Sequence, residues 1–448
     1  HASAQGGRPG SEKQGFYGRG PKPGRWLRLG AKHVTVAAMH SESTAPAAPS
    51  WVQAGTPAYR RISLALFLAG FATFSLLYCV QPVLPELAAH FGLGAAGSSL
   101  ALSVTTGCLA VAIFVAGALS EGRDQRRLMF ASMALAALCN VLAAVAPTWG
   151  GLLVARAFEG LLLGGVPAVA MAYLSNHIHP RGLGFSMGLY IGGTAFGGMA
   201  GRIGMSALAD HFGWRVALAT MGVLGLVSAV GFVGLLPRTG GSDTPAARSR
   251  SLSYHLDAWR THLQTPGLPL LFASGFALMG VFVSLFNYAG FRLALPPYGL
   301  SQTQIGLIFS VYLFGMVASP TAGALADRWG RAPVLVGGVV LMSAGVLLTL
   351  VAPLAGVIAG IAVLTFGFFV AHAVASGWVG RLALQSKGHA SSLYLLAYYL
   401  GSSLLGSAGG WFWEHGRWPA LVVFSLALLA GALWLALRLR GMADAAKG

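Results

Sequence analysis

Residues 323–333 read GALADRWGRAP, a short charged turn between two long apolar runs. The turn holds three of the chain's few charged residues, Asp327, Arg328 and Arg331. A weaker copy lies 206 residues earlier, where residues 117–127 read GALSEGRDQRR, again between two apolar runs. Two copies of one charged turn, each joining two apolar segments, indicate a chain built from two similar halves.

The composition indicates a membrane protein. Of the 448 residues, 55% are apolar and only 9% are charged, whereas a soluble domain carries about 25% charged residues. So little charge cannot cover a water-soluble globule of this size, and most of the chain must face lipid or other membrane segments. The cysteines at 79, 108 and 139 lie inside apolar runs without metal-ligand spacing, which predicts packing residues and no metal site.

Twelve apolar runs follow residue 61, each 19–26 residues long. About 20 helical residues cross a hydrocarbon core of about 30 Å, so each run is long enough to be a transmembrane helix. The runs are 62–84, 98–119, 128–146, 150–174, 183–205, 215–236, 268–290, 304–326, 333–352, 355–380, 391–412 and 418–437. The sequence therefore predicts an all-α membrane protein with twelve spans and both termini on one side.

The basic residues predict which side that is. The chain has 29 Lys and Arg against 12 acidic residues, and they fall mostly in the gaps between runs. After residue 61, the gaps on the side of the termini hold 15 of them, and the opposite gaps hold three, or four with Arg202 near the end of its run. Because positive residues favour the cytoplasm, we expect both termini there. They do not gather on one helix face, so we expect no nucleic-acid partner.

The predicted domain organisation has five parts. Residues 1–58 are rich in Gly, Pro, Ser and Arg and are expected to be a disordered tail, with Met39 as an alternative true start. Two six-helix bundles cover residues 59–236 and 268–440. A linker at 237–267 carries apolar residues at helical spacing, which predicts a short amphipathic helix on the inner membrane surface. Residues 441–448 form a C-terminal tail.

Six plus six helices, a long inner linker and a G-x-L-x-D-R-x-G-R turn together resemble the major facilitator superfamily. The glycine-rich run 188–202 and the segment 368–378 are similar to the branch of bacterial inner-membrane sugar or drug efflux proteins of the arabinose-exporter type. The resemblance implies two pseudo-symmetric six-helix bundles that transport by alternating access. It covers nearly the whole chain from about residue 60 onward, although the strict antiporter motif's Gly-Pro pair is missing from the run 188–202.

The two charged turns are candidate conformational latches on the inner face. Asp327 can accept charge-assisted hydrogen bonds from Arg328 or Arg331, while Gly323 and Gly330 would allow close helix approach and a turn. The alternative is that these residues only anchor the chain at the inner leaflet. The first copy has Glu121 where the family has Asp, and it is the weaker of the two. The candidate latch residues are Gly323, Asp327, Arg328, Gly330 and Arg331, with Gly117, Glu121, Arg126 and Arg127 in the first copy.

Arg156 and Glu159 are the only charged residues that the sequence places clearly inside a span. A charge there is costly and usually has a partner, and residues at i and i+3 share one helix face. Glu159 could exchange a proton while Arg156 holds its charged form; alternatively, the pair or arginine–carbonyl bonds are only structural. Arg156, Gly160 and Gly164 resemble the family's second motif, which is associated with proton coupling. His372, inside its run, is a third coupling candidate or a neutral packing residue.

Polar and aromatic residues within the runs are candidates to line a central cavity, where folds of this kind place their substrates. A tyrosine near a helix end is more often an anchor at the membrane surface. The cavity candidates are Tyr78, Gln81, Tyr190, Asn287, Tyr288 and Tyr398. The glycines predicted to pack helices closely are Gly160, Gly164, Gly193, Gly197 and Gly201.

The function expected from the sequence is secondary active transport of a small drug-like or sugar-derived compound, as proton-coupled efflux across a bacterial inner membrane. No enzymatic motif and no nucleotide-binding loop occur, so we expect no enzyme activity and no cofactor beyond a proton gradient. The expected partners are the substrate, protons and the lipid bilayer, with a monomer sufficient. The alternatives are a proton-coupled importer or facilitator, or a non-transporting sensor or scaffold of the same fold.

Overall fold

The protein is described by a computed structural model that covers residues 51–119, 124–237 and 251–445. Within these ranges it is helical apart from short connections and one isolated bridge, Val52 with Ile178. The elements are α1 (Pro57–Tyr78), η1 (Gln81–Val83), α2 (Leu84–Phe91), α3 (Ala95–Leu119), α4 (Gln125–Val145), α5 (Trp149–Leu163), α6 (Gly165–His177), α7 (Pro180–Leu235), α8 (Leu252–Gln264), α9 (Leu268–Ala294), α10 (Gln302–Ile308), η2 (Phe309–Val311), α11 (Tyr312–Trp329), α12 (Arg331–Leu348), α13 (Leu354–Leu382) and α14 (Lys387–Ala445).

The structure contains twelve membrane crossings in its described part. Ten helical stretches are long and apolar enough to span a bilayer, and two of them are 56 residues long. Each of these two is interrupted by non-helical backbone, at Gly213 in α7 and at Gly416 and Arg417 in α14. Because each long helix is therefore two limbs joined by a tight turn, ten stretches give twelve spans. The predicted twelve-helix fold is confirmed.

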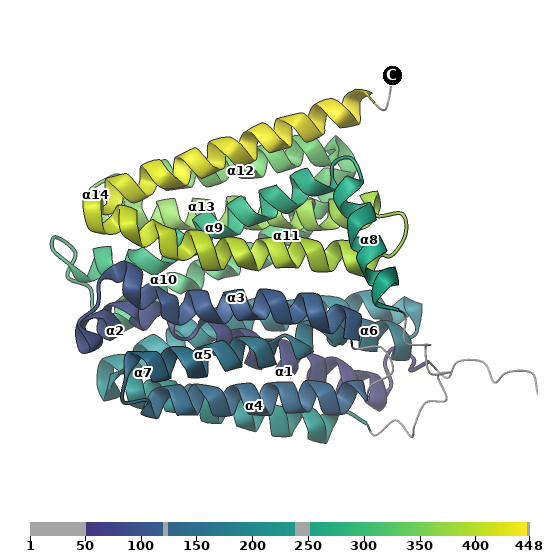
Figure 1. The fold of residues 1–448 in the computed structure, drawn as a ribbon, viewed down its shortest axis with the longest axis horizontal. Helices are drawn as coiled ribbons and strands as arrows, with labels where there is room; N and C mark the ends of the chain where they lie inside the picture. Colours follow the sequence, from purple (N-terminus) through teal and green to yellow (C-terminus); the bar gives the residue numbers. More distant parts are fainter. Residues whose placement is uncertain (1–50, 120–123, 238–250, 446–448) are drawn as a thin grey trace, which may run out of the picture. The chain divides into compact units, whose positions relative to one another are not determined.

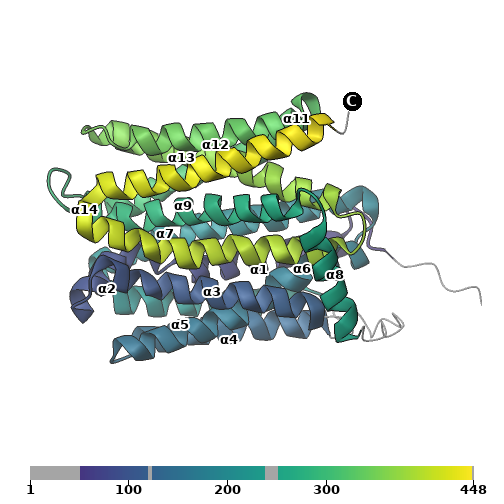
Figure 2. The same ribbon diagram turned by 45° about the horizontal axis from the view of Figure 1, so that its top comes forward.

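The spans form two groups that follow the chain. Helices α1–α7 lie together, and helices α9–α14 lie together beside them, as Figure 1 shows from its purple-to-teal and green-to-yellow colours. We call the side on which α1 begins and α14 ends the tail face, on the right of Figure 1, and the opposite side, on which α14 turns back, the far face. In both views α8 lies at the tail face, beside both groups (Figure 2).

The linker helix α8 contacts both halves. The ring of Trp259 stacks on Phe114 of α3 with centroids 4.1 Å apart. On its other side Tyr254 shares a hydrogen bond of 3.0 Å with the hydroxyl of Ser386, just before α14. The helix begins directly after Ser251, whose hydroxyl accepts a hydrogen bond from the Tyr254 backbone and so caps an otherwise unsatisfied N–H. Thus α8 is packed against the tail ends of the bundles.

The first span is broken near the far face. Helix α1 begins after the Thr56 cap and ends at Tyr78, followed by the 3₁₀ turn of η1 and then α2. Pro82 and Pro85 lack a backbone N–H, so they cannot continue the helical hydrogen bonding of the preceding turn. The break leaves the last carbonyls of α1 available to side chains of other helices.

Glycines allow the first limb of α7 to lie directly against α1. A Cβ added at Gly193, Gly197 or Gly201 would collide with the backbone of α1. Gly160 and Gly164 are crowded in the same way by α3. The two spans of each pair can therefore approach only because these positions carry no side chain.

One predicted glycine contact is wrong. Nothing lies within 4 Å of a Cβ built at Gly323, so this glycine does not bring α11 close to a neighbouring helix. Gly330 has a φ of +90°, a conformation that favours glycine, and it provides the sharp turn between α11 and α12. Of the two glycines in the charged turn, only Gly330 has the predicted geometric role.

Candidate functional site

The second charged turn connects two helices of the C-terminal half. An oxygen of Asp327 lies 3.3 Å from Arg331 and 3.4 Å from Arg381, at the end of α13. Asp327 is 67% exposed. Arg328 makes no ion pair with any residue that the structure describes. The turn therefore fastens α11, α12 and α13 together at the tail face, within one half.

The first charged turn does the same with different chemistry. Arg126 donates hydrogen bonds to the carbonyls of Val233 and Leu236, at the end of α7, over 2.6 and 3.1 Å. Asp124 pairs with Arg127 at 3.1 Å on the surface. The backbone of Gly117 is helical, and Glu121 lies outside the described residues. In the first turn, Arg126 fastens α4 to α7 by binding carbonyls at a helix end. In the second turn, an acid, Asp327, bridges two arginines instead.

Arg156 and Glu159 form an ion pair of 2.7 Å in which both side chains are 0% exposed. Arg156 also donates to the carbonyls of Leu76, Leu77 and Ala101 and to the amide oxygen of Asn140. Both interpretations of this arginine from the sequence are thus present at once, the neutralised pair and the carbonyl bonds. Three other spans, α1, α3 and α4, meet on one guanidinium.

One oxygen of Glu159 remains available. Its Oε2 accepts from Arg156, whereas Oε1 is buried and has no hydrogen-bond partner among the residues in the described ranges. A buried polar atom without a partner is unusual and marks a place where water, a proton or a rearranged side chain can act. The carboxylate is therefore held on one side and unsatisfied on the other.

The structure places a third charged residue, Arg202, inside a span. The prediction that only Arg156 and Glu159 are charged there is therefore wrong. The sequence placed Arg202 near a helix end, but the first limb of α7 continues to Gly213, so Arg202 lies about 16 Å along the helix from that turn. It is 1% exposed. In the described part of the chain no carboxylate pairs with it. An arginine inside a glycine-rich apolar run was the signal that could have identified it.

Aromatic rings and a glutamine surround Arg202. Its guanidinium carbon lies 4.1 Å from the ring centroid of Tyr78, 4.8 Å from that of Tyr312 and 5.3 Å from that of Phe309. Its Nε donates to the oxygen of Gln81 over 2.6 Å, and Nη1 donates to the carbonyl of Gly198. Since Phe309 and Tyr312 belong to the C-terminal half, the cation contacts rings from both halves.

Two cavity candidates meet across the halves. The amide nitrogen of Gln81 donates to the amide oxygen of Asn287 over 2.7 Å, and both side chains are buried. Because Gln81 also binds Arg202, a continuous polar path runs from α7 through η1 to α9. The sequence indicated Gln81 and Asn287 separately, and the structure places them in contact.

The tyrosine candidates separate into two groups. Tyr288 donates to the carbonyl of Gly406 over 2.9 Å and ties α9 to α14, so its hydroxyl is already used. The hydroxyls of Tyr78, Tyr190 and Tyr398 make no hydrogen bond to any residue in the described part of the chain, and neither does that of Tyr399, which the sequence pattern did not single out. Four phenols from α1, α7 and α14 therefore have hydroxyls that no described protein group satisfies.

His372 lies in an aromatic cluster within the C-terminal half. Its Nδ1 is 2.9 Å from the hydroxyl of Tyr394, and its ring lies 4.6 Å from that of Tyr398 and 5.7 Å from that of Phe368. It has no acidic partner among the described residues. This environment suits a neutral imidazole that orients Tyr394.

The halves are joined by hydrogen bonds near the far face. Asp210 accepts from the Thr303 hydroxyl over 2.6 Å, and the Ser407 and Ser103 hydroxyls are 2.7 Å apart. Apart from the contacts of α8, the hydrogen bonds between the halves in the described ranges all lie in the part of the molecule nearer the far face. The one farthest from that face is made by Ser403, near the middle of the first limb of α14. Besides the two contacts named first, these bonds join Gln81–Asn287, Glu414–Ala96, Ser99–Ser407, Gln302–Pro82 and Ser403–Ser103.

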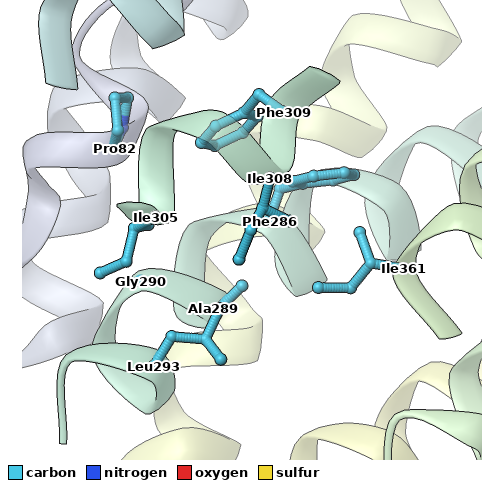
Figure 3. Close-up of a pocket in the computed structure, with 9 residues that line it drawn as sticks. All are labelled: Pro82, Phe286, Ala289, Gly290, Leu293, Ile305, Ile308, Phe309 and Ile361. Carbon is cyan, nitrogen blue, oxygen red and sulfur yellow. The ribbon is translucent and has the colours of Figure 1, made fainter. Parts of the chain in front are cut away.

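A small pocket lies beside these bonds. Figure 3 shows its lining of apolar side chains from η1, α9, α10, η2 and α13, including Pro82 and Phe309. The cavity measures about 10 Å³, roughly the room for one water molecule. It is too small and too apolar to hold a substrate, and it belongs to the packing that closes the far side.

Comparisons with known proteins identify the family of the chain. The sequence pattern of the Major Facilitator Superfamily matches residues 66–296 and 277–447. The chain belongs to the major facilitator superfamily. It is 45% identical over 389 residues to the "Inner membrane transport protein YnfM" of Escherichia coli K12, covering 87% of this chain and 93% of that protein. It is 42% identical to the "Uncharacterized MFS-type transporter YybF" of Bacillus subtilis, covering 86% and 95%.

Solved structures of two other transporters show a similar fold. A bacterial homolog of the human lysosomal transporter Spinster has a TM-score of 0.68 at 14% identity and covers 86% of this chain and 98% of its own. The nucleoside transporter NupG, in a variant form, has a TM-score of 0.67 at 15% identity, covering 85% and 99%. The chain is therefore a multi-pass membrane protein of the major facilitator fold, and its relatives are named as transporters.

Proposed function

We propose that the protein exports a small organic compound in exchange for protons, by alternating access of a central site between its two halves. The observation that carries the proposal is the buried Arg156–Glu159 pair, because Arg156 holds the carbonyls of Leu76 and Leu77 at the end of α1. An ionisable pair inside the membrane is costly and commonly marks an ion path. Membership of the superfamily supports transport, while coupling and direction are our proposal.

The coupling step is a change in the charge of Glu159. When Glu159 is deprotonated, it balances Arg156 at 2.7 Å. When it is protonated, the guanidinium loses its counter-charge, which changes the balance of its hydrogen bonds to the last carbonyls of α1. The next residues are Tyr78 and Gln81, which contact Arg202 and Asn287 at the junction of the halves. Protonation of Glu159 would thus be linked mechanically to the contacts that close the far face.

The access states follow from where the halves are joined. Hydrogen bonds between them are concentrated toward the far face, which supports a state closed on that side. The excess of Lys and Arg in the gaps of the tail face supports a cytoplasmic orientation of that face in a bacterial inner membrane. Both halves of the site come from one chain, so a monomer suffices.

Proteoliposomes with an imposed pH gradient test the proposal directly. A panel of anionic, neutral and cationic organic compounds is added, and the internal pH is followed with a trapped dye. We expect substrate-dependent proton flux in the native protein and its loss in Glu159→Gln. Asp257→Asn, the same loss of charge at an exposed acid of α8, is the matched control and should leave the flux unchanged.

The outcomes distinguish the alternatives. Unchanged proton flux in a well-folded Glu159→Gln variant would exclude Glu159 as the coupling group. Substrate movement without any proton flux would indicate a facilitator. If no compound moves and no flux appears, a non-transporting role gains support.

A further inference from the structure

We infer that the transported compound is a small organic anion with a planar body, and that Arg202 binds its carboxylate. The inference rests on the proposed function and specifies its substrate class. It is drawn from the charge, the burial and the unused hydrogen-bonding groups around Arg202.

Arg202 lacks the counter-charge that Arg156 has. It is 1% exposed, and its hydrogen bonds from Nε and Nη1 go to two neutral acceptors, Gln81 and Gly198. Three residues after Arg156 the chain places Glu159, whereas three residues after Arg202 it places Met205. A buried charge is normally balanced by an opposite charge. The described part of the chain provides none here, which leaves the position suited to an anion from outside.

Nearby acids are already engaged elsewhere. Asp210, on the same limb of α7, accepts hydrogen bonds from the backbone and hydroxyl of Thr303 at the far face. Glu414 accepts from the backbone of Ala96 across the halves. Neither acid pairs with a basic side chain in the described ranges, and both belong to the contacts that join the halves. Within the described ranges, Arg202 therefore has no paired carboxylate at the junction.

The tyrosines supply the rest of a carboxylate site. Tyr78 is 5% exposed and Tyr399 is 3% exposed, yet their hydroxyls bond to no residue that the structure describes. The rings of Tyr78 and Tyr312, one from each half, lie 4.1 and 4.8 Å from the guanidinium carbon of Arg202. Buried phenols contributed by both halves offer donors to carboxylate oxygens and flat surfaces to a planar ring. A cationic ligand would be repelled by Arg202.

Phe309 limits where the anion can lie. Its ring faces the guanidinium of Arg202 at 5.3 Å, and it also lines the 10 Å³ apolar pocket toward the far side (Figure 3). That pocket has no polar lining residue and no room for a carboxylate. We therefore place the anion on the tail-face side of these rings.

Binding to the purified full chain in lipid nanodiscs tests the inference without requiring transport. The probes are benzoate and cinnamate, with benzamide as a neutral analogue of the same shape and benzylamine as a cationic one. Calorimetry and thermal stabilisation should detect the two carboxylates and neither analogue. Arg202→Gln should weaken carboxylate binding by about tenfold or more, and Arg202→Lys by less, because a point charge replaces a two-pronged donor.

Arg215→Gln is the matched control. Arg215 also lies on α7 and also faces an aromatic ring, that of Trp214, but it binds the carbonyls of Ala144 and Ala146 near the far face. Its loss should leave carboxylate affinity unchanged. Size-exclusion chromatography and thermal unfolding of Arg202→Lys test for misfolding. If the variant is monodisperse and as stable as the native protein, a loss of binding reflects the site.

Each result decides something. Carboxylate affinity that is equal in native protein and a folded Arg202→Gln variant would show that Arg202 only clamps the halves, and absence of carboxylate binding would overturn the inference too. Proton-coupled transport of neutral or cationic compounds alone would leave the proposed function standing and reject the anion. Benzoate binding and movement without proton flux would support the anion and reject proton coupling.

Discussion

Two buried arginines lie near the break after α1, and they differ in whether a carboxylate balances their charge. Arg156 reaches the carbonyls of Leu76 and Leu77 from one side, and Arg202 contacts Tyr78 and Gln81 from the other. Arg156 has an acid on its own helix, and its hydrogen bonds within the described ranges stay in its own half, whereas Arg202 has no acid among the described residues and touches rings of both halves. The first contact can persist while the halves move, and the second must change.

The largest expected effect comes from removing the acid of the balanced arginine. Glu159→Leu leaves Arg156 buried without its counter-charge, which typically costs about 3–5 kcal/mol. Denaturation of the purified protein in detergent should show this loss of stability. Glu159→Gln keeps a hydrogen-bond acceptor and should be milder. A Leu variant as stable as the native protein would show that carbonyl bonds alone suffice for Arg156.

A smaller effect is expected at the polar path between the halves. Gln81→Leu removes the acceptor of Arg202 and the donor to Asn287, and unsatisfied buried groups cost about 1–3 kcal/mol. The junction should also open more often. A cysteine introduced at Ser407 should then react faster with an impermeant maleimide added from the far face. Unchanged labelling in Gln81→Leu would mean that the serine contacts alone hold the junction.

The tyrosines give a paired prediction of lesser size. Tyr288→Phe removes a hydrogen bond to Gly406 and should lower stability by about 1 kcal/mol. Tyr399→Phe removes a hydroxyl without a partner among the described residues and should leave stability unchanged while weakening carboxylate binding. Thermal unfolding and calorimetry of both variants measure the contrast. A stability loss in Tyr399→Phe that matches that of Tyr288→Phe would contradict the assignment of an unused hydroxyl.

The smallest effect on stability is expected at the exposed turn. Asp327→Asn removes the bridge to Arg331 and Arg381, and exposed ion pairs contribute little to stability. Insertion and unfolding should therefore be unchanged, while transport falls, because the tail ends of α11 and α13 lose their shared anion. Asp124→Asn in the first turn is the control with no expected effect, since Arg126 there binds carbonyls. Normal transport by Asp327→Asn would reject the latch.

The fold could be predicted from the sequence because apolar length alone determines a membrane span. The turns at Gly213 and Gly416 lie between apolar runs that the sequence already separates, so the apolar runs alone suffice to count twelve spans. The internal pair of Arg156 and Glu159 was also predictable, since both residues lie on one helix at i and i+3.

The contacts around Arg202 could not be predicted in the same way. The apolar run that holds Arg202 stops at residue 205, which predicts a helix end there, although the mixed segment 206–212, SALADHF, continues the helix to Gly213. Its neighbours Gln81 and Phe309 are 121 and 107 residues away along the chain, and no local pattern brings them together. Tyr399 could not be singled out because only the depth and rotation of its helix separate it from an ordinary packing tyrosine.

The stacked rings of Trp259 and Phe114 make the linker helix a built-in optical reporter. Trp259 belongs to α8, which is fastened to Ser386 before α14, while Phe114 belongs to α3 in the other half. A rotation of the halves that opens the tail face would pull the two rings apart and change the emission of that indole. With the other tryptophans replaced by phenylalanine, fluorescence could follow the transport cycle in real time without any attached dye.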